Sequence, residues 1–166
     1  MLETAFQYQD EIQRAYGKTV LQDKYKYVNN SNYWSYKLEL CNDSWNSLEF
    51  VSISPQENYI NGYFKAGISR VSEMVDYIVI MSFCDKPNAT FAKDLYRFLH
   101  DLFFKYNFRK INFSVVIGNP IEKSYDKFIE RHGGRVVGIN KSDIRLHDGK
   151  YYDIKHYEIF REEYKK

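Results

Sequence analysis

The second half of the sequence alternates between short apolar segments and longer segments with helical periodicity. VDYIVIMSF (75–83) is nearly all apolar, which is typical of a central strand buried on both faces. Residues 91–106 then change period, with large apolar side chains at the spacing of an amphipathic helix. INFSVVI (111–117) repeats the strand pattern, and residues 120–132 again have helical spacing. A strand–helix–strand–helix order of this kind predicts a mixed α/β sheet.

The start of the second helix carries a distinct local signal. Asn119 suits the N-cap, Pro120 the first helical position and Glu122 the third position after the cap. Gly133 and Gly134 follow where a helix would end. We therefore expect this helix to begin at Pro120 and to stop before the two glycines.

Four further segments have the composition of strands. They form two pairs, and turn-forming residues connect the two segments of each pair. They are LEFVSIS (48–54), YINGYFKAGI (59–68) and the segments at about 135–146 and 151–160. Residues 55–58 supply the first turn, and Asp148-Gly149 supplies the second. The sheet is therefore expected to contain two antiparallel pairs of neighbouring strands.

The N-terminal third is harder to assign. Residues 2–16 place apolar side chains near helical spacing, which predicts a helix that stops at Gly17. Residues 18–33 are polar and tyrosine-rich, without an assignable pattern. Residues 34–45 fit both the alternation of a strand and one face of a helix, and the helix is favoured.

Composition limits the class of protein. A chain of 166 residues, 44% hydrophobic and 28% charged, suits one globular domain over residues 1–166. No segment approaches the roughly 20 apolar residues of a membrane helix, and no signal peptide is visible. Cys41 and Cys84 cannot supply a disulfide framework or a structural zinc site. We therefore expect a cytoplasmic protein with reduced thiols and no metal.

Charge and aromatic content bear on the choice of partner. The net charge is +2 and lysines are scattered among acids, so nucleic acid is an unfavoured partner. The 16 Tyr and 12 Phe could stack on single-stranded bases, but packing in the core is the favoured explanation. The four histidines lack the spacing of metal ligands.

The segments from residue 75 to residue 132, with Asn119 between the last strand and helix, resemble the GNAT superfamily of acyl-CoA-dependent N-acyltransferases. The resemblance covers about residues 48–160 and rests more on the order of elements than on motifs. It implies a GNAT-like α/β (α+β) fold. The central sheet would be mixed and mostly antiparallel, splayed at residues 81–84, with helices on both faces.

The resemblance also implies a binding site for acetyl-CoA. In the family, backbone N–H groups in the loop before the helix that corresponds to residues 91–106 bind the CoA pyrophosphate, as a helix N-terminus allows. The matching segment is Pro87-Asn88-Ala89-Thr90-Phe91-Ala92, of which only Ala92 fits the family's glycine-containing pattern, and Asn88 to Ala92 are the implied binding residues. The backbone of Met81, Ser82 and Phe83 would pair with the pantetheine arm, and Asn119 would contact CoA. The alternative is a plain connection in which Asn88 or Thr90 caps the helix.

The implied reaction is transfer of an acyl group, expected to be acetyl, to an amine of unknown acceptor. Tyr125 would protonate the leaving thiolate, although it comes six residues after Asn119 where the family has seven. Glu73 and Asp76 are the candidate acceptors of the amine proton. The departures from the family pattern favour an alternative, a catalytically weakened GNAT-fold binding or structural module. A homodimer through an exposed edge strand stays open.

Overall fold

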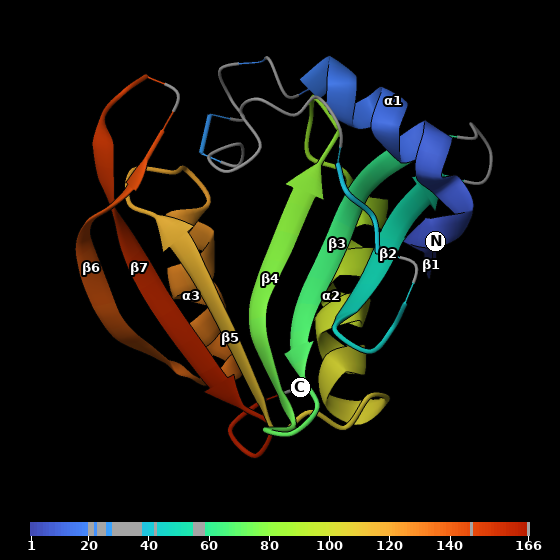
Figure 1. Cartoon of the computed structure of the whole chain (residues 1–166). Helices are drawn as coiled ribbons and strands as arrows, with labels where there is room; N and C mark the ends of the chain where they lie inside the picture. The colour runs from blue at the N-terminus through green and yellow to red at the C-terminus, as the bar shows by residue number, and fades with distance from the viewer. Residues whose placement is uncertain are drawn as a thin grey trace.

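The computed structural model describes residues 1–19, 22, 26–27, 38–41, 43–54, 59–146 and 148–165. Over these residues the chain forms one seven-stranded sheet, with strand order β1-β2-β3-β4-β5-β7-β6 (Figure 1). The strands are β1 (Leu2–Thr4), β2 (Ser47–Ser54), β3 (Tyr59–Ser69), β4 (Met74–Ser82), β5 (Lys110–Val116), β6 (Arg135–Arg145) and β7 (Tyr151–Phe160). The helices are α1 (Gln9–Thr19), α2 (Ala89–Phe104) and α3 (Glu122–His132). Only β4 and β5 pair in parallel among the described strands.

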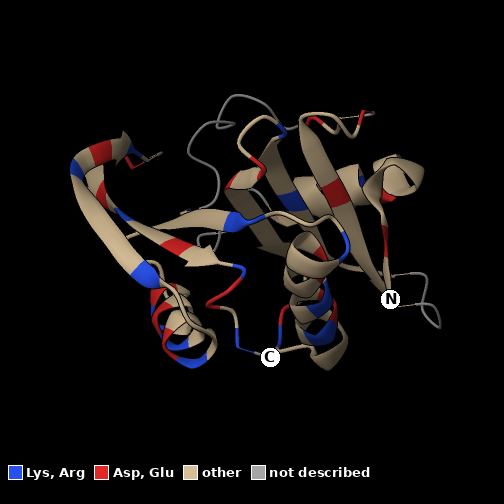
Figure 2. Ribbon diagram, turned by 90° about the horizontal axis from the view of Figure 1, so that it is seen from below, with Lys and Arg blue, Asp and Glu red and all other residues tan. Residues whose placement is uncertain are grey.

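The sheet separates two apolar cores. On the front face α1 packs Ile12 and Tyr16 against β2, β3 and the end of β4. On the back face α2 and α3 cover different parts of the sheet, and α2 supplies Phe98, Leu102 and Phe103 to the larger core. Figure 2 shows these two helices on the same side of the sheet, side by side but apart. The mixed α/β architecture and all six strands predicted from residue 48 onward are confirmed, as is the amphipathic helix after residue 90.

The N-terminal segment departs from its prediction. Its first residues form β1 and a 3-10 turn (Ala5–Tyr8), and α1 continues past Gly17 to Thr19. The prediction of a single helix over 2–16 is wrong because β1 is held by a distant partner, Phe50–Ser52, which local periodicity does not reveal.

The helix favoured for residues 34–45 is wrong over residues 38–41 and 43–46, which contain no helix. The Glu49 carboxylate on β2 accepts a hydrogen bond from the Cys41 N–H, so the segment is tied to the sheet instead. Residues 34–37 and 42 lie outside the described residues, as does the predicted turn at 55–58.

Strand β4 is not buried on both faces, because it separates from β5 after two register pairs, Met74–Lys110 and Val75–Ile111. The register between β3 and β4 shifts at the next residue, so that Asp76 forms a bulge. A bulge bends its strand and increases the local twist, which accounts for the divergence. Asp76 and Tyr77 are consequently exposed. The splay therefore begins at Asp76 rather than at the predicted residues 81–84.

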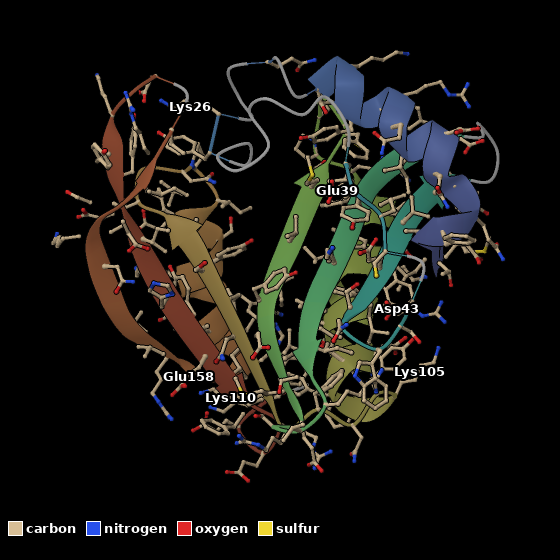
Figure 3. All side chains as sticks on the ribbon, in the orientation of Figure 1. Lys26, Glu39, Asp43, Lys105, Lys110 and Glu158 are labelled. Carbon is tan, nitrogen blue, oxygen red and sulfur yellow. The ribbon has the colours of Figure 1, made fainter. Side chains whose placement is uncertain are left out.

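Below the splay, an ion-pair cluster holds β5, β7 and β6 together (Figure 3). The Glu158 carboxylate contacts Lys110 Nζ at 2.5 Å and Arg135 Nη2 at 2.8 Å. The hydrogen bond from Lys110 is the main cause of the lowered pKa of Glu158. This cluster joins β5, β7 and β6 next to the closed end of the opening between β4 and β5, where Lys110 is paired in register with Met74.

We expect Glu158→Gln to destabilise the protein by about 1 kcal/mol at pH 7, the upper end of what an ion pair near the protein surface contributes. A carboxyl whose pKa is lowered by folding stabilises the native state above its unfolded pKa, and this contribution is lost as pH falls through the folded pKa. Urea unfolding of both proteins should therefore give a difference at pH 7 that shrinks toward pH 3. The exposed Glu162→Gln is the control. A difference that does not depend on pH would contradict the assignment to charge.

Candidate active site

The divergence of β4 and β5 opens a cleft of about 370 Å³ that passes through the plane of the sheet. Its wall combines residues from β4, β5, α2, the β5–α3 loop and α3, together with Tyr27 and one residue of β7. These residues are Tyr27, Ile78, Val79, Ile80, Ser82, Phe91, Leu95, Ser114, Val115, Val116, Asn119, Ile121, Tyr125 and Ile154. Four of the predicted site residues, Ser82, Phe91, Asn119 and Tyr125, thus meet in one cleft.

The edge of β4 that faces the cleft carries backbone groups without a strand partner. The Phe83 N–H donates to the Asn61 carbonyl on β3 at 2.8 Å. Because hydrogen-bonding direction alternates along a strand, Met81 also directs its backbone groups to β3, whereas Ile78 and Ile80 direct theirs to the cleft. Beyond Val75, no described strand pairs with this edge. An extended ligand could therefore add to it as a strand does.

Met81 and Phe83 thus lie differently from what the resemblance implies. Both side chains are buried in the front-face core with α1, and the Phe83 N–H is already bonded to β3. Among the predicted β4 residues, only Ser82 lines the cleft. The sequence analysis did not select Ile78 and Ile80. Because hydrogen-bonding direction alternates along a strand, their backbone groups are the ones that an extended ligand in the cleft can pair with.

The N-terminus of α2 lies at one end of the cleft. Asn88 is its N-cap, with Oδ1 accepting from the Phe91 N–H at 2.9 Å, and the Asn88 carbonyl accepts from the Ala92 N–H. The first-turn N–H groups of Ala89 and Thr90 have no partner among the described residues. The first turn contains no acidic residue. The Asn88 cap therefore leaves the N–H groups of Ala89 and Thr90 available as donors at this helix end.

The β5–α3 connection is shaped by Asn119, although α3 begins at Glu122 instead of Pro120. Asn119 Oδ1 accepts from the Ile121 N–H at 3.1 Å, and the Glu122 carboxylate accepts from the Gly118 N–H at 3.2 Å. These reciprocal bonds resemble a capping box placed around a turn that precedes the helix. The predicted helix start was two residues early because Pro120 forms part of this turn.

Tyr125 lies on the first turn of α3 and lines the cleft. Its ring packs edge-on against Phe113 and Tyr157, and its hydroxyl has no hydrogen-bond partner among the described residues. Burial raises the pKa of Tyr125 to about 12, so the phenol is protonated at neutral pH. The structure therefore places a proton donor in the cleft.

Asp126, the seventh residue after Asn119, is engaged elsewhere. Its carboxylate accepts from Lys155 Nζ at 2.6 Å and from the Tyr157 hydroxyl at 2.8 Å. The hydrogen bond from Lys155 is the main cause of its lowered pKa. Asp126 thus joins α3 to β7 and leaves Tyr125 as the side chain of this turn that reaches the cleft.

The predicted carboxylates do not line the cleft. Glu73 lies in the turn between β3 and β4, exposed and with φ of 50°, at the closed end of the splay. Asp76 is exposed at the bulge where the two strands part. On the front face, the exposed Glu39 lies on the segment that crosses the sheet (Figure 3), a carboxylate that the sequence analysis did not select.

Several other cleft residues were not among the predicted site residues. Ser114 interrupts an otherwise apolar strand, a signal that would have marked it. Tyr27 belongs to the tyrosine-rich segment without an assignable pattern, and Ile154 belongs to β7, which meets the cleft only through the tertiary fold. No local feature of the sequence distinguishes these last two residues.

Solved structures share this arrangement of sheet and helices. A GCN5-related N-acetyltransferase from Brucella melitensis matches 98% of this chain and 76% of its own, with a TM-score of 0.69 and 16% identity. The spermidine/spermine N-acetyltransferase SpeG from Vibrio cholerae, in complex with manganese ions, matches 71% of this chain and 67% of its own, with a TM-score of 0.60 and 22% identity. This is the GNAT fold. No protein-family model and no curated protein sequence matches the chain.

The GNAT fold confirms the architecture that the sequence resemblance implied. Within the described ranges, no cluster of His, Cys, Asp or Glu has a metal-binding arrangement. None of the described helices has the length and apolar character needed to cross a membrane. Both cysteines are free thiols.

Proposed function

We propose that this protein is an acyl-CoA-dependent N-acyltransferase that passes an acyl group directly to an amine, with acetyl-CoA as the reference donor. The observation that carries the proposal is the cleft through the sheet. It brings together the free edge of β4, the α2 N-terminus and the protonated phenol of Tyr125. These three features match the three parts of an acyl-CoA, namely the pantetheine arm, the pyrophosphate and the thioester.

Binding of the donor would use mostly backbone groups. The N–H groups of Ala89 and Thr90 would bind the pyrophosphate, and the exposed Lys86 and Lys93 flank that helix end in the sequence. The pantetheine arm would pair with Ile78 and Ile80 on the edge of β4. Because such contacts need no particular side chain, a loop without the family's glycines can still supply them.

The reaction would proceed through a tetrahedral intermediate. A neutral amine attacks the thioester carbonyl, and a β4 N–H stabilises the oxyanion. The carbon–sulfur bond then breaks, and Tyr125 donates its proton to the thiolate. Of the two predicted carboxylates, Asp76 lies nearer along the chain to Ile78, which lines the cleft. We therefore assign Asp76 to accept the amine proton through water. Glu73, at the closed end of the splay, receives no role.

A direct test uses purified protein, acetyl-CoA and a panel of amines, with CoA release followed by a thiol reagent. The panel includes spermidine and spermine, because SpeG is named for activity on them. Amine-dependent CoA release would support the enzyme. Tight acetyl-CoA binding without turnover would favour the binding module, an alternative that the exposure of both predicted carboxylates outside the cleft supports.

The pyrophosphate contact can be tested separately with Thr90→Pro. Proline is tolerated in the first turn of a helix and removes one N–H donor. Losing one hydrogen bond to a charged group should weaken CoA binding about 10-fold in calorimetry. Pantetheine, which lacks the pyrophosphate, should bind both proteins equally. Equal CoA affinity in the two proteins would place the pyrophosphate elsewhere.

A further inference from the structure

A second cavity, here called the chamber, lies between α2 and α3 on the back face of the sheet. Its volume is about 230 Å³. Apolar side chains from both helices and from β4 and β5 form its wall, among them Leu99, Phe113 and Phe128. The hydroxyls of Ser124 and Tyr125 are the only polar side-chain groups among the described residues of that wall.

The chamber exists because the two helices follow the two diverging halves of the sheet. At their C-terminal ends Tyr164 bridges them, with its ring 5.0 Å from that of Phe103 and 5.6 Å from that of His132. Figure 2 shows the chain terminus between the helices at this end. The helices are thus braced there and remain apart closer to the cleft.

Ile121 and Ser124 on this wall are exposed, so the chamber is a partly open apolar hollow rather than a closed void. Side chains in a well-packed core would fill a space of this size. Each ordered water needs two to four polar partners, so the two hydroxyls of this wall can hold only one or two of the several waters that the space would take. The chamber therefore suits an apolar occupant better than water.

The chamber adjoins the cleft at Tyr125. The two spaces share five wall residues, Ile78, Ile80, Leu95, Ile121 and Tyr125. Tyr125 is the residue proposed to protonate the sulfur of the donor. The carbon chain attached to a thioester held at Tyr125 would therefore lie at the mouth of the chamber.

We infer that the donor is an acyl-CoA with a straight, apolar acyl chain of about six to eight carbons, which lies in the chamber. The inference rests on the proposed function and names its donor class. The volume corresponds to roughly seven or eight units of about 30 Å³, the share of one water molecule and close to that of a methylene. An acetyl group would leave nearly all of this apolar space unfilled.

The test is the affinity of the purified full chain for a series of straight-chain acyl-CoAs from acetyl to dodecanoyl, measured by calorimetry with CoA as reference. Each methylene buried in an apolar site should tighten binding about fourfold. We expect this rise to continue to hexanoyl or octanoyl and then to stop. A flat series, or weaker binding of the longer chains than of acetyl-CoA, would overturn the inference.

Two variants that fill the chamber test whether the acyl chain lies in it. Leu99→Phe adds volume to its buried wall, and Ser124→Phe adds a ring from an exposed rim position that is less critical for folding. Lys127→Phe is the control, an exposed α3 residue that does not line the chamber. In Ser124→Phe, the affinity for octanoyl-CoA should come to within about threefold of the affinity for acetyl-CoA. In Lys127→Phe, the full difference between the two affinities should remain. A chain-length preference that survives Ser124→Phe would contradict the chamber as its source.

Failure of this inference can be distinguished from failure of the proposed function. If acetyl-CoA and CoA bind but chain length has no effect, only the chamber assignment fails. If neither CoA nor any acyl-CoA binds, the acyltransferase proposal fails and the donor class fails with it.

Discussion

Tyr125→Phe is expected to lower the rate of acyl transfer about 100-fold, because a positioned general acid contributes on this scale. The substitution removes only a hydroxyl that has no partner among the described residues, so the packing against Phe113 and Tyr157 is kept. Affinity for acetyl-CoA and the melting temperature should both stay nearly unchanged. Single-turnover kinetics with acetyl-CoA and an accepted amine measure the effect on chemistry.

The control for this prediction is Tyr96→Phe, an exposed tyrosine on α2 that does not line the cleft. It should leave the rate as it is. A turnover of Tyr125→Phe within about twofold of the parent would remove Tyr125 from the mechanism. A loss that accompanies a fall in melting temperature would instead indicate a structural role.

Gly62→Ala should lower the stability by about 2–3 kcal/mol, equivalent to roughly 5–10 °C in melting temperature. A Cβ on Gly62 would overlap the Met81 carbonyl oxygen and the Phe91 ring. The carbonyl belongs to the neighbouring strand and cannot move aside without disturbing the sheet. Since Phe91 lines the cleft, acetyl-CoA affinity should fall as well.

Gly67→Ala offers a matched comparison on the same strand. The three atoms nearest to a Cβ there all belong to the ring of Tyr77, a residue that is 48% exposed, so that a side chain rather than backbone has to move. Its cost should stay under about 1 kcal/mol. Differential scanning calorimetry of both variants checks the difference, and equal destabilisation would show that the backbone contact at Gly62 is not decisive.

The parts of the fold that could be predicted are those coded by neighbouring residues. The alternation and apolar runs after residue 48 located β2 to β7, and helical spacing located α2. The three residues of β1 could not be found in this way, because their partner lies some fifty residues further along the chain. Strand β4 looked fully buried because its composition does not record that β5 leaves it after Val75.

The residues of the candidate site that could be predicted are those that a local sequence pattern marks. Asn88 was identified as a candidate cap and caps α2, whereas Asn119 was expected to cap α3 and instead accepts a hydrogen bond within the turn that precedes this helix. Tyr125 was selected by resemblance, and the structure places it in the cleft, while its catalytic role stays a prediction. Tyr27 and Ile154 could not be selected, since only the tertiary arrangement brings them to the cleft.

The two register pairs between β4 and β5 also determine how the protein can open. In the described part of the chain, backbone hydrogen bonds join the half that contains β1–β4 to the half that contains β5–β7 only near the closed end of the splay. Amide protons in the two halves can therefore exchange through separate opening events, as they do in other proteins with distinct cooperative units. A donor lying along β4 and touching α3 would span both halves. Binding of the donor would then join the two halves into one cooperative unit. Amide exchange would therefore slow in both halves, including at amides far from the cleft.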